Sequence, residues 1–183
     1  MSDLTLLGLC GSLRRDSFNR KLMLEAAAAF GGNFVDGDLR FPLFDEDLEA
    51  AEGIPQPVAT LAEQIGAADA VVIACPEYNK APPGALKNAL DWVSRVKGNP
   101  WKDKPVALVS ATGGRAGGER TQFALRLMMV PFSPRLLMGP EVLVGAASDQ
   151  FDDAGKLTNE INSKALTDLM AKLRAEAALV AKA

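Results

Sequence analysis

The chain has 183 residues, 48% hydrophobic and 23% charged, which indicates a single globular domain over residues 1–183 with a full core. Its net charge of −3 argues against a nucleic-acid binder that depends on phosphate contacts. Histidine is absent and Cys10 and Cys75 are the only cysteines, which excludes Ser-His-Asp and Cys-His catalysis and disfavours metal and disulfide sites. An enzyme of this composition needs an organic cofactor for its chemistry.

The first residues have no basic region ahead of their apolar run, so we interpret them as the start of a strand rather than as a signal peptide. No apolar stretch approaches the length that crosses a bilayer, and we expect a cytoplasmic protein. Residues 4–10 predict a buried strand, residues 11–16 a loop, and Phe18–Phe30 a helix that Ser17 caps.

The rest of the chain alternates strands with helices. Further strands are predicted at residues 33–39, 68–74, 106–110 and 141–144. Further helices are predicted at residues 58–67, 83–97, 119–129 and 159–180, the last with Ile161, Ala165, Leu169 and Leu173 on its core face. Residues 41–51 are expected to be a connection with a small apolar hook. Five strands alternating with five helices predict a parallel, doubly wound sheet.

The segment 75–92, CPEYNKAPPGALKNALDW, follows the third predicted strand. Pro76 cannot donate a ladder hydrogen bond, so the strand should stop there, and Pro83 suits a first helical position. Residues 76–82, which include Glu77 and Tyr78, therefore form a loop at the carboxyl end of a strand. In open α/β sheets this is the edge at which ligands bind.

Two other loops are expected at the same edge. In residues 11–19, the hydroxyls of Ser12 and Ser17, the amide of Asn19 and the free N–H groups of a helix start predict an anion site, to which Arg14 can add a charged contact. The alternative, equally supported by this loop alone, is that Ser17 only caps the helix and the arginines are solvated. The glycines of residues 112–118 allow backbone to approach a flat ligand.

Three motifs together resemble the NADPH-dependent FMN reductase family: GSLRxxSxN after the first strand, PEYN with GALKNALDW after the third, and SxxGG after the fourth. The resemblance extends along the whole chain. It implies a flavodoxin-like three-layer sandwich, with a five-stranded parallel sheet in the order 2-1-3-4-5 and helices on both faces. It also implies bound FMN, NADH or NADPH as co-substrate, and a flavin, quinone, chromate, azo or ferric-chelate acceptor.

The resemblance also assigns site residues. The FMN phosphate would be held by Ser12, Arg14, Ser17, Asn19 and the backbone of Phe18. The isoalloxazine would be lined by Pro76, Glu77, Tyr78 and Asn79. The other ring edge and the ribityl chain would be covered by Ser110, Thr112, Gly113 and Gly114. Arg15 has no clear family role, and no motif shows which arginine binds a nicotinamide phosphate: Arg14, Arg15, Arg115 or Arg120.

Hydride transfer between nicotinamide and flavin needs no protein acid or base, so a chain without histidine can support it. With no second nucleotide domain, both substrates would share one flavin face and react by ping-pong exchange. The alternative is a flavodoxin-like electron carrier without efficient NAD(P)H turnover. Cys75 is expected to be a small buried packing residue, with a redox role as the minor alternative.

The helix predicted at residues 83–97 carries two apolar stripes, one of them formed by Ala85, Ala89, Trp92 and Val96. A helix packed on a sheet needs only one stripe, so the second predicts a homodimer or homotetramer. The alternative is that Trp92 packs under the chain's own C-terminal helix. On the polar edge of the same helix, Arg95 is predicted to attract anionic acceptors to a flavin pocket, either its own or that of the partner.

Overall fold

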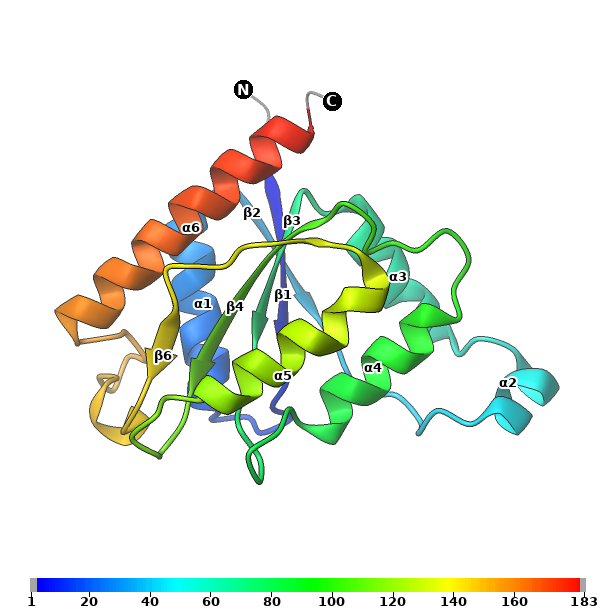
Figure 1. Ribbon diagram of the computed structural model, residues 1–183, viewed down its shortest axis with the longest axis horizontal. Helices are drawn as coiled ribbons and strands as arrows, with labels where there is room; N and C mark the ends of the chain where they lie inside the picture. The colour runs from blue at the N-terminus through cyan, green and yellow to red at the C-terminus, as the bar shows by residue number, and fades with distance from the viewer. Residues whose placement is uncertain (1–2, 182–183) are drawn as a thin grey trace.

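The computed structural model describes residues 3–181 and forms a three-layer α/β sandwich (Figure 1). Its strands are β1 Thr5–Cys10, β2 Asn33–Gly37, β3 Ala70–Ala74, β4 Pro105–Ala111, β5 Arg135–Leu136 and β6 Val142–Val144. All pairings are parallel, in the order β2-β1-β3-β4-β5, and β6 also pairs with β4. This is the flavodoxin-like order that the sequence predicted.

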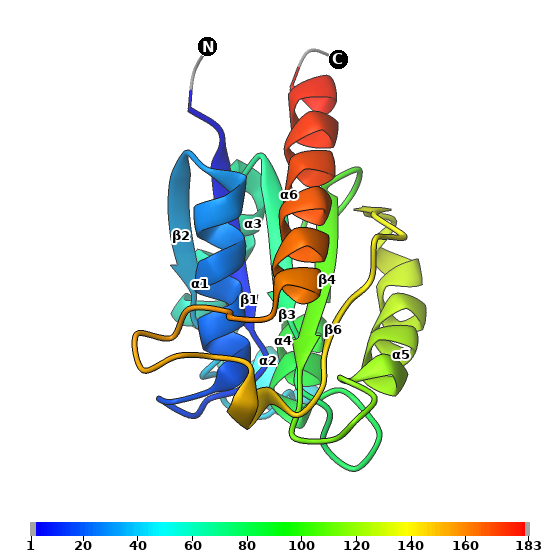
Figure 2. The same ribbon diagram turned by 90° about the vertical axis from the view of Figure 1, so that its left-hand side faces the viewer.

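Helices cover both faces of the sheet. The α-helices are α1 Phe18–Phe30, α2 Glu46–Glu52, α3 Gln56–Ala67, α4 Gly84–Ser94, α5 Glu119–Met129 and α6 Glu160–Val180. Short 3₁₀ turns occur at Val130–Phe132 and Ala147–Asp149. Helices α1 and α6 pack on one face, and α3, α4 and α5 lie on the other (Figures 1 and 2). Within residues 3–181, no helix is both long and apolar enough to span a bilayer.

Strand β3 shows how the sequence builds two cores from one run of apolar residues. All five of its residues are fully buried. Because successive side chains of a strand point to opposite faces, Val72 packs with α1 and α6, whereas Val71 and Ile73 pack against α3 and α4. A parallel strand covered by helices on both faces therefore has no polar alternation.

One expectation about the chain between its main elements was wrong, and one strand was not predicted. Residues 41–51 are not only a connection, because they contain most of α2, where Asp45 caps the helix by accepting a hydrogen bond from the Asp47 N–H. No residue of α2 is buried, so it lacks the apolar periodicity that would have revealed it. The strand predicted at residues 141–144 is confirmed as β6, whereas β5, which pairs with the other end of β4, was not predicted.

The core face of α6 also differs from the prediction at its start. Ile161 is 81% exposed, and Ala165 is only partly buried. The buried face instead contains Leu166, Leu169, Met170, Leu173 and Ala177. The first turn of α6 extends past the sheet, so a residue at the correct helical spacing there has nothing to pack against.

Candidate functional site

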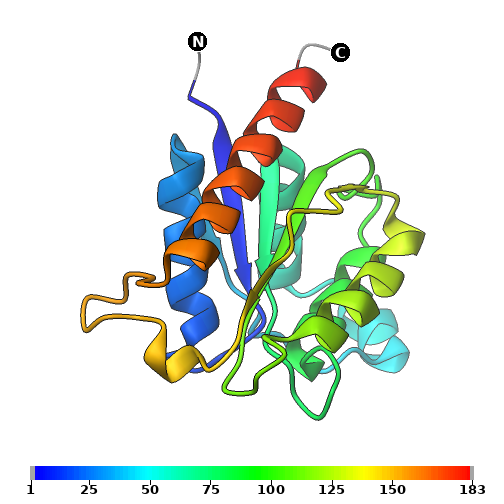
Figure 3. The same ribbon diagram turned by 60° about the vertical axis from the view of Figure 1, so that its left-hand side comes forward.

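The loops that follow β1, β3 and β4 gather at the carboxyl edge of the sheet (Figure 3). Backbone hydrogen bonds between neighbouring strands continue into these loops. The Gly11 N–H donates to the Ala74 carbonyl and the Cys75 N–H to the Val109 carbonyl, each at 2.9 Å. The Thr112 N–H donates to the Val144 carbonyl, also at 2.9 Å. The sheet thus holds the first residues of all three loops in place.

The three loops enclose a cleft of about 280 Å³. It is lined by Ser12, Arg14, Ser17, Phe18, Asn19, Pro76, Glu77, Tyr78, Ala111, Thr112 and Gly113. The structure therefore brings together all the predicted FMN-binding residues except Asn79, Ser110 and Gly114. Ala111 is the one lining residue that the sequence did not indicate, because a strand-end alanine carries no chemical signal.

The start of α1 supplies hydrogen-bond donors to this cleft. The buried Ser17 hydroxyl caps the helix by accepting from the Asn19 N–H at 3.2 Å. The N–H groups of Phe18 and Arg20 lie in the first turn and have no hydrogen-bond partner within residues 3–181. Free first-turn amides and the positive end of the helix dipole favour an anion at this place.

The side chain of Asn19 already makes two hydrogen bonds within the protein. Its Nδ2 donates to the Ala111 carbonyl at 2.7 Å, and its Oδ1 accepts from the Ala111 N–H at 3.0 Å. Asn19 therefore ties the start of α1 to the end of β4. Together with the capping role of Ser17, this shows that two residues predicted as phosphate ligands also have structural roles.

Tyr78 connects the loop after β3 to the loop after β1. Its hydroxyl lies 3.2 Å from the Ser12 Oγ. The residue begins a tight turn in which the N–H of Tyr78 and of Ala81 each donates to the carbonyl of the other. Asn79 and Lys80 sit in this turn with φ of 52° and 67°, and both are exposed beyond the cleft. Tyr78 is 47% exposed, which leaves part of its surface free to pack on a ligand.

The other polar groups of this loop bind the start of α5. The Glu77 Oε2 accepts from the Thr121 N–H at 3.3 Å, and the Thr121 hydroxyl donates to the Pro76 carbonyl at 3.2 Å. The Cys75 Sγ lies 3.2 Å from the same hydroxyl. Burial raises the pKa of the Cys75 thiol to about 12, so it stays protonated at neutral pH and favours a packing role over a redox one.

Ser110 is hydrogen-bonded to the loop after β4. It is fully buried, its Oγ donates to the Gly117 carbonyl at 2.6 Å, and Gln122 Nε2 donates to its Oγ at 3.0 Å. A Cβ on Gly117 would lie 2.4 Å from the backbone of Leu143, so this glycine permits close packing on β6. A Cβ on Gly113, by contrast, would meet nothing within 4 Å, which leaves that part of the loop open towards the cleft.

The second stripe of α4 is covered by the chain itself. Trp92 is fully buried, its Nε1 donates to the Pro42 carbonyl at 2.8 Å, and its ring meets that of Phe44 edge-on at 5.0 Å between centroids. The inference that this stripe faces a partner was wrong. The alternative that Trp92 packs under the C-terminal helix was also wrong, because α6 lies on the opposite face of the sheet.

Arg95 does not reach the cleft of its own chain. It follows the last turn of α4, roughly 16 Å along the helix from the loop after β3. Its Nε donates to Glu49 Oε2 at 2.8 Å, and its guanidinium lies 5.9 Å from the centroid of the Phe44 ring. Asp91 pairs with Lys87 instead, at 2.6 Å.

The donors and shapes of the cleft fit the two chemically different parts of FMN. Free amides at the start of α1, the Ser12 hydroxyl and the Arg14 guanidinium suit a phosphate ester. The Tyr78 ring and the open backbone at Gly113 suit one edge of a flat ring system. Neither part requires a titrating protein group.

Comparison with known proteins gives consistent matches. The profile of the NADPH-dependent FMN reductase family matches residues 4–149. The chain is 40% identical over 161 residues to an NAD(P)H-dependent FMN reductase of Pseudomonas aeruginosa, and the match covers 86% of each chain. It is also 40% identical over 153 residues to a quinone reductase of Escherichia coli, and that match covers 81% of each chain. FerB, a flavoenzyme NAD(P)H:(acceptor) oxidoreductase from Paracoccus denitrificans, superposes with a TM-score of 0.85 at 30% identity, covering 96% of this chain and 97% of FerB.

Proposed function

Because this chain belongs to the NADPH-dependent FMN reductase family, we propose that it passes a hydride from NAD(P)H to bound FMN and then reduces a small acceptor by ping-pong exchange. Membership of the family makes the protein an oxidoreductase with FMN as its cofactor and NAD(P)H as its reductant. The proposed acceptors are quinones, free flavin, chromate, azo compounds and ferric chelates. The relatives named as quinone reductases favour the first of these. A cytoplasmic location remains a prediction.

The observation that carries this proposal is the composition of the cleft. The cleft combines anion donors with an aromatic ring and open backbone, and none of its lining residues is a histidine. When bound there, FMN would supply the hydride chemistry at its N5. The residues of the chain would bind and orient the FMN. The first-turn amides and Arg14 would hold its phosphate, and Tyr78 would pack on its ring.

The shape of the site supports the proposed order of the reaction. Residues 3–181 form one domain around one sheet, and the three loops enclose one cleft at its carboxyl edge. A single cleft favours an approach of the reductant and the acceptor to the ring from the same open side. We propose that NAD(P)H leaves before the acceptor binds.

We also propose that the protein is a homodimer or homotetramer, through a surface other than the stripe around Trp92. Helix α5 and the turn after it expose Phe123, Leu127 and Val130, which are 54%, 75% and 68% exposed. Their spacing of four and three residues places them on one side of the helix. Beside them, a hollow between α4 and α5 is lined in part by Leu90 and Met128. An apolar ridge next to an apolar hollow suits a self-complementary contact.

The role proposed for Arg95 depends on such an assembly. Within one chain Arg95 is distant from the cleft, so it can attract anionic acceptors only to the site of a partner subunit. Arg95→Ala should then slow anionic acceptors more than neutral quinones, with a difference that shrinks as salt is added. Equal slowing of both classes would show that Arg95 only pairs with Glu49.

The visible spectrum of the purified protein, followed by anaerobic titration with NADH and with NADPH, tests the central proposal. We expect an oxidised flavin spectrum that bleaches with one equivalent of reductant, and released cofactor that co-migrates with FMN on chromatography. Bound FMN that neither nicotinamide reduces at a useful rate would contradict the proposal and support the electron-carrier alternative.

A further inference from the structure

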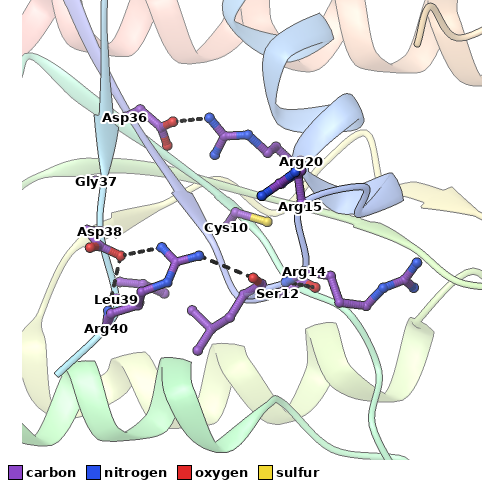
Figure 4. Close-up of a pocket in the computed structure, with 11 residues that line it drawn as sticks. Cys10, Ser12, Arg14, Arg15, Arg20, Asp36, Gly37, Asp38, Leu39 and Arg40 are labelled. Atoms are coloured by element: carbon purple, nitrogen blue, oxygen red, sulfur yellow. Dashed lines mark hydrogen bonds and ion pairs between the residues drawn. The ribbon is translucent and has the colours of Figure 1, made fainter. Parts of the chain in front are cut away.

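A second cavity lies on the other side of the loop after β1, against the end of β2. Its volume is about 420 Å³, and it shares Ser12 and Arg14 with the cofactor cleft. Figure 4 shows the guanidinium groups of Arg15, Arg20 and Arg40 arranged around the Cys10 thiol. The cavity is therefore a neighbour of the cleft, separated from it by the backbone of the loop.

The charged lining of this cavity is predominantly basic. Six charged side chains line it: Arg14, Arg15, Arg20, Arg40, Asp36 and Asp38. Arg20 pairs with Asp36, and Arg40 pairs with Asp38 at 2.9 Å. Arg14 and Arg15 form no ion pair within residues 3–181, so four cations and two anions leave the cavity with an excess of positive charge.

Hydrogen bonds hold two of the four guanidinium groups in place. Arg40 donates both to Asp38 and, at 3.2 Å, to the Leu13 carbonyl, which fixes its guanidinium against the loop after β1. Arg20 is fixed in the same way by Asp36, whose hydrogen bond raises the pKa of the guanidinium further. Arg15 is exposed and keeps all its donors free. A free guanidinium beside two fixed ones suits an oxyanion that accepts several hydrogen bonds.

We propose that this cavity binds a phosphate group and that Arg15 is its principal ligand. The phosphate could come from either of two sources, the 2′-phosphate of NADPH or free inorganic phosphate. Only the first source rests on the proposed function. An arginine is the usual partner of a 2′-phosphate in dinucleotide sites, and NADH lacks that group. Of the four arginines that the sequence left open, Arg115 and Arg120 do not line this cavity.

The test uses FMN-saturated protein, so that the cofactor cleft is filled. Calorimetric titrations with adenosine 2′,5′-bisphosphate, adenosine 5′-monophosphate and inorganic phosphate are compared for the wild type, Arg15→Gln and Arg120→Gln. Arg120 is also exposed and without an ion pair in the described chain, so it is a matched control. We expect the wild type and Arg120→Gln to bind the bisphosphate about tenfold more tightly than the monophosphate, and Arg15→Gln to lose most of that ratio.

The outcomes separate the two sources and the two proposals. A ratio lost only in Arg15→Gln supports the site and assigns it to NADPH. Inorganic phosphate binding that needs Arg15, without any preference between the two adenosine compounds, supports the site and assigns it to free phosphate. The proposed site is overturned if Arg15→Gln binds all three compounds as the wild type does, or if the affinity ratio is lost in Arg120→Gln instead. Anaerobic flavin bleaching by NADH, measured in parallel, tests the proposed function separately, because NADH does not need this cavity.

Discussion

Asn19 has a structural role that supports the cleft. Its side chain bonds both backbone groups of Ala111, 92 positions away, and so joins the anion-binding loop to β4. We expect Asn19→Ala to lower the free energy of unfolding of the cofactor-free protein by about 2–4 kcal/mol, because it leaves two buried backbone groups unpaired. Urea unfolding measures this, with the exposed Asn33→Ala as control. A loss no larger than that of the control would show that the contact is unimportant.

Cys75 should make stability depend on pH in the alkaline range. Its folded pKa, raised by burial to about 12, lies above the usual value of 9.0, so the unfolded state loses its thiol proton first. The stabilisation is complete below pH 9 and is lost as the pH rises towards 12. The unfolding free energy of the wild type should therefore fall more steeply between pH 9 and 12 than that of Cys75→Ala. Parallel pH profiles would indicate that the thiol is not desolvated.

At the scale of elements, α4 supports the segment that leads into α2. The Asn88 Oδ1 accepts from the Phe44 N–H at 2.8 Å and its Nδ2 donates to the Pro42 carbonyl at 2.9 Å, beside the indole of Trp92. This face of α4 therefore anchors a loop of the same chain.

The two tryptophans provide a matched test of that anchor. Both are buried, but the Trp92 Nε1 has a partner in Pro42, whereas the Trp101 Nε1 has none within residues 3–181. Trp92→Phe should therefore cost about 1–2 kcal/mol more unfolding free energy than Trp101→Phe, since the loss of packing is similar and only one hydrogen bond is removed. Equal costs in chemical denaturation would mean that the bond to Pro42 contributes nothing.

At the scale of the whole molecule, the ridge on α5 predicts how subunits associate. Leu127→Lys places a charge in the centre of the ridge and should convert the oligomer to a monomer at micromolar concentration, as measured by light scattering. Ile161→Lys is the control, because Ile161 is equally apolar and exposed but lies on α6. A monomeric wild type, or an oligomer insensitive to Leu127→Lys, would contradict the proposed surface.

The single cleft predicts the form of the steady-state kinetics. If both substrates use the same open side, double-reciprocal plots should be parallel, and high concentrations of either substrate should inhibit. Stopped-flow mixing with NAD(P)H under nitrogen should bleach the flavin at least as fast as turnover. Intersecting lines would show that the reductant and the acceptor bind together, which would contradict the proposed ping-pong exchange.

The sequence alone determined the elements whose signals are local. Strand β3 is an uninterrupted apolar run because helices cover both its faces, and Pro76 and Pro83 delimit the loop that follows because proline cannot continue a strand and readily starts a helix. For the same reason, the loop motifs indicated most of the residues that line the cleft. These features depend on neighbours along the chain.

Only the tertiary structure decided what each polar or aromatic group binds. An amide such as Asn19 can bond a ligand or a distant backbone equally well, and its partner Ala111 has no recognisable sequence signal. The burial of Trp92 depends on Pro42 and Phe44 folding back over α4, and the exposure of Ile161 depends on where the sheet ends. The basic cavity arises because β2 ends beside the loop after β1. Such contacts join residues far apart in the chain, so local pattern does not specify them.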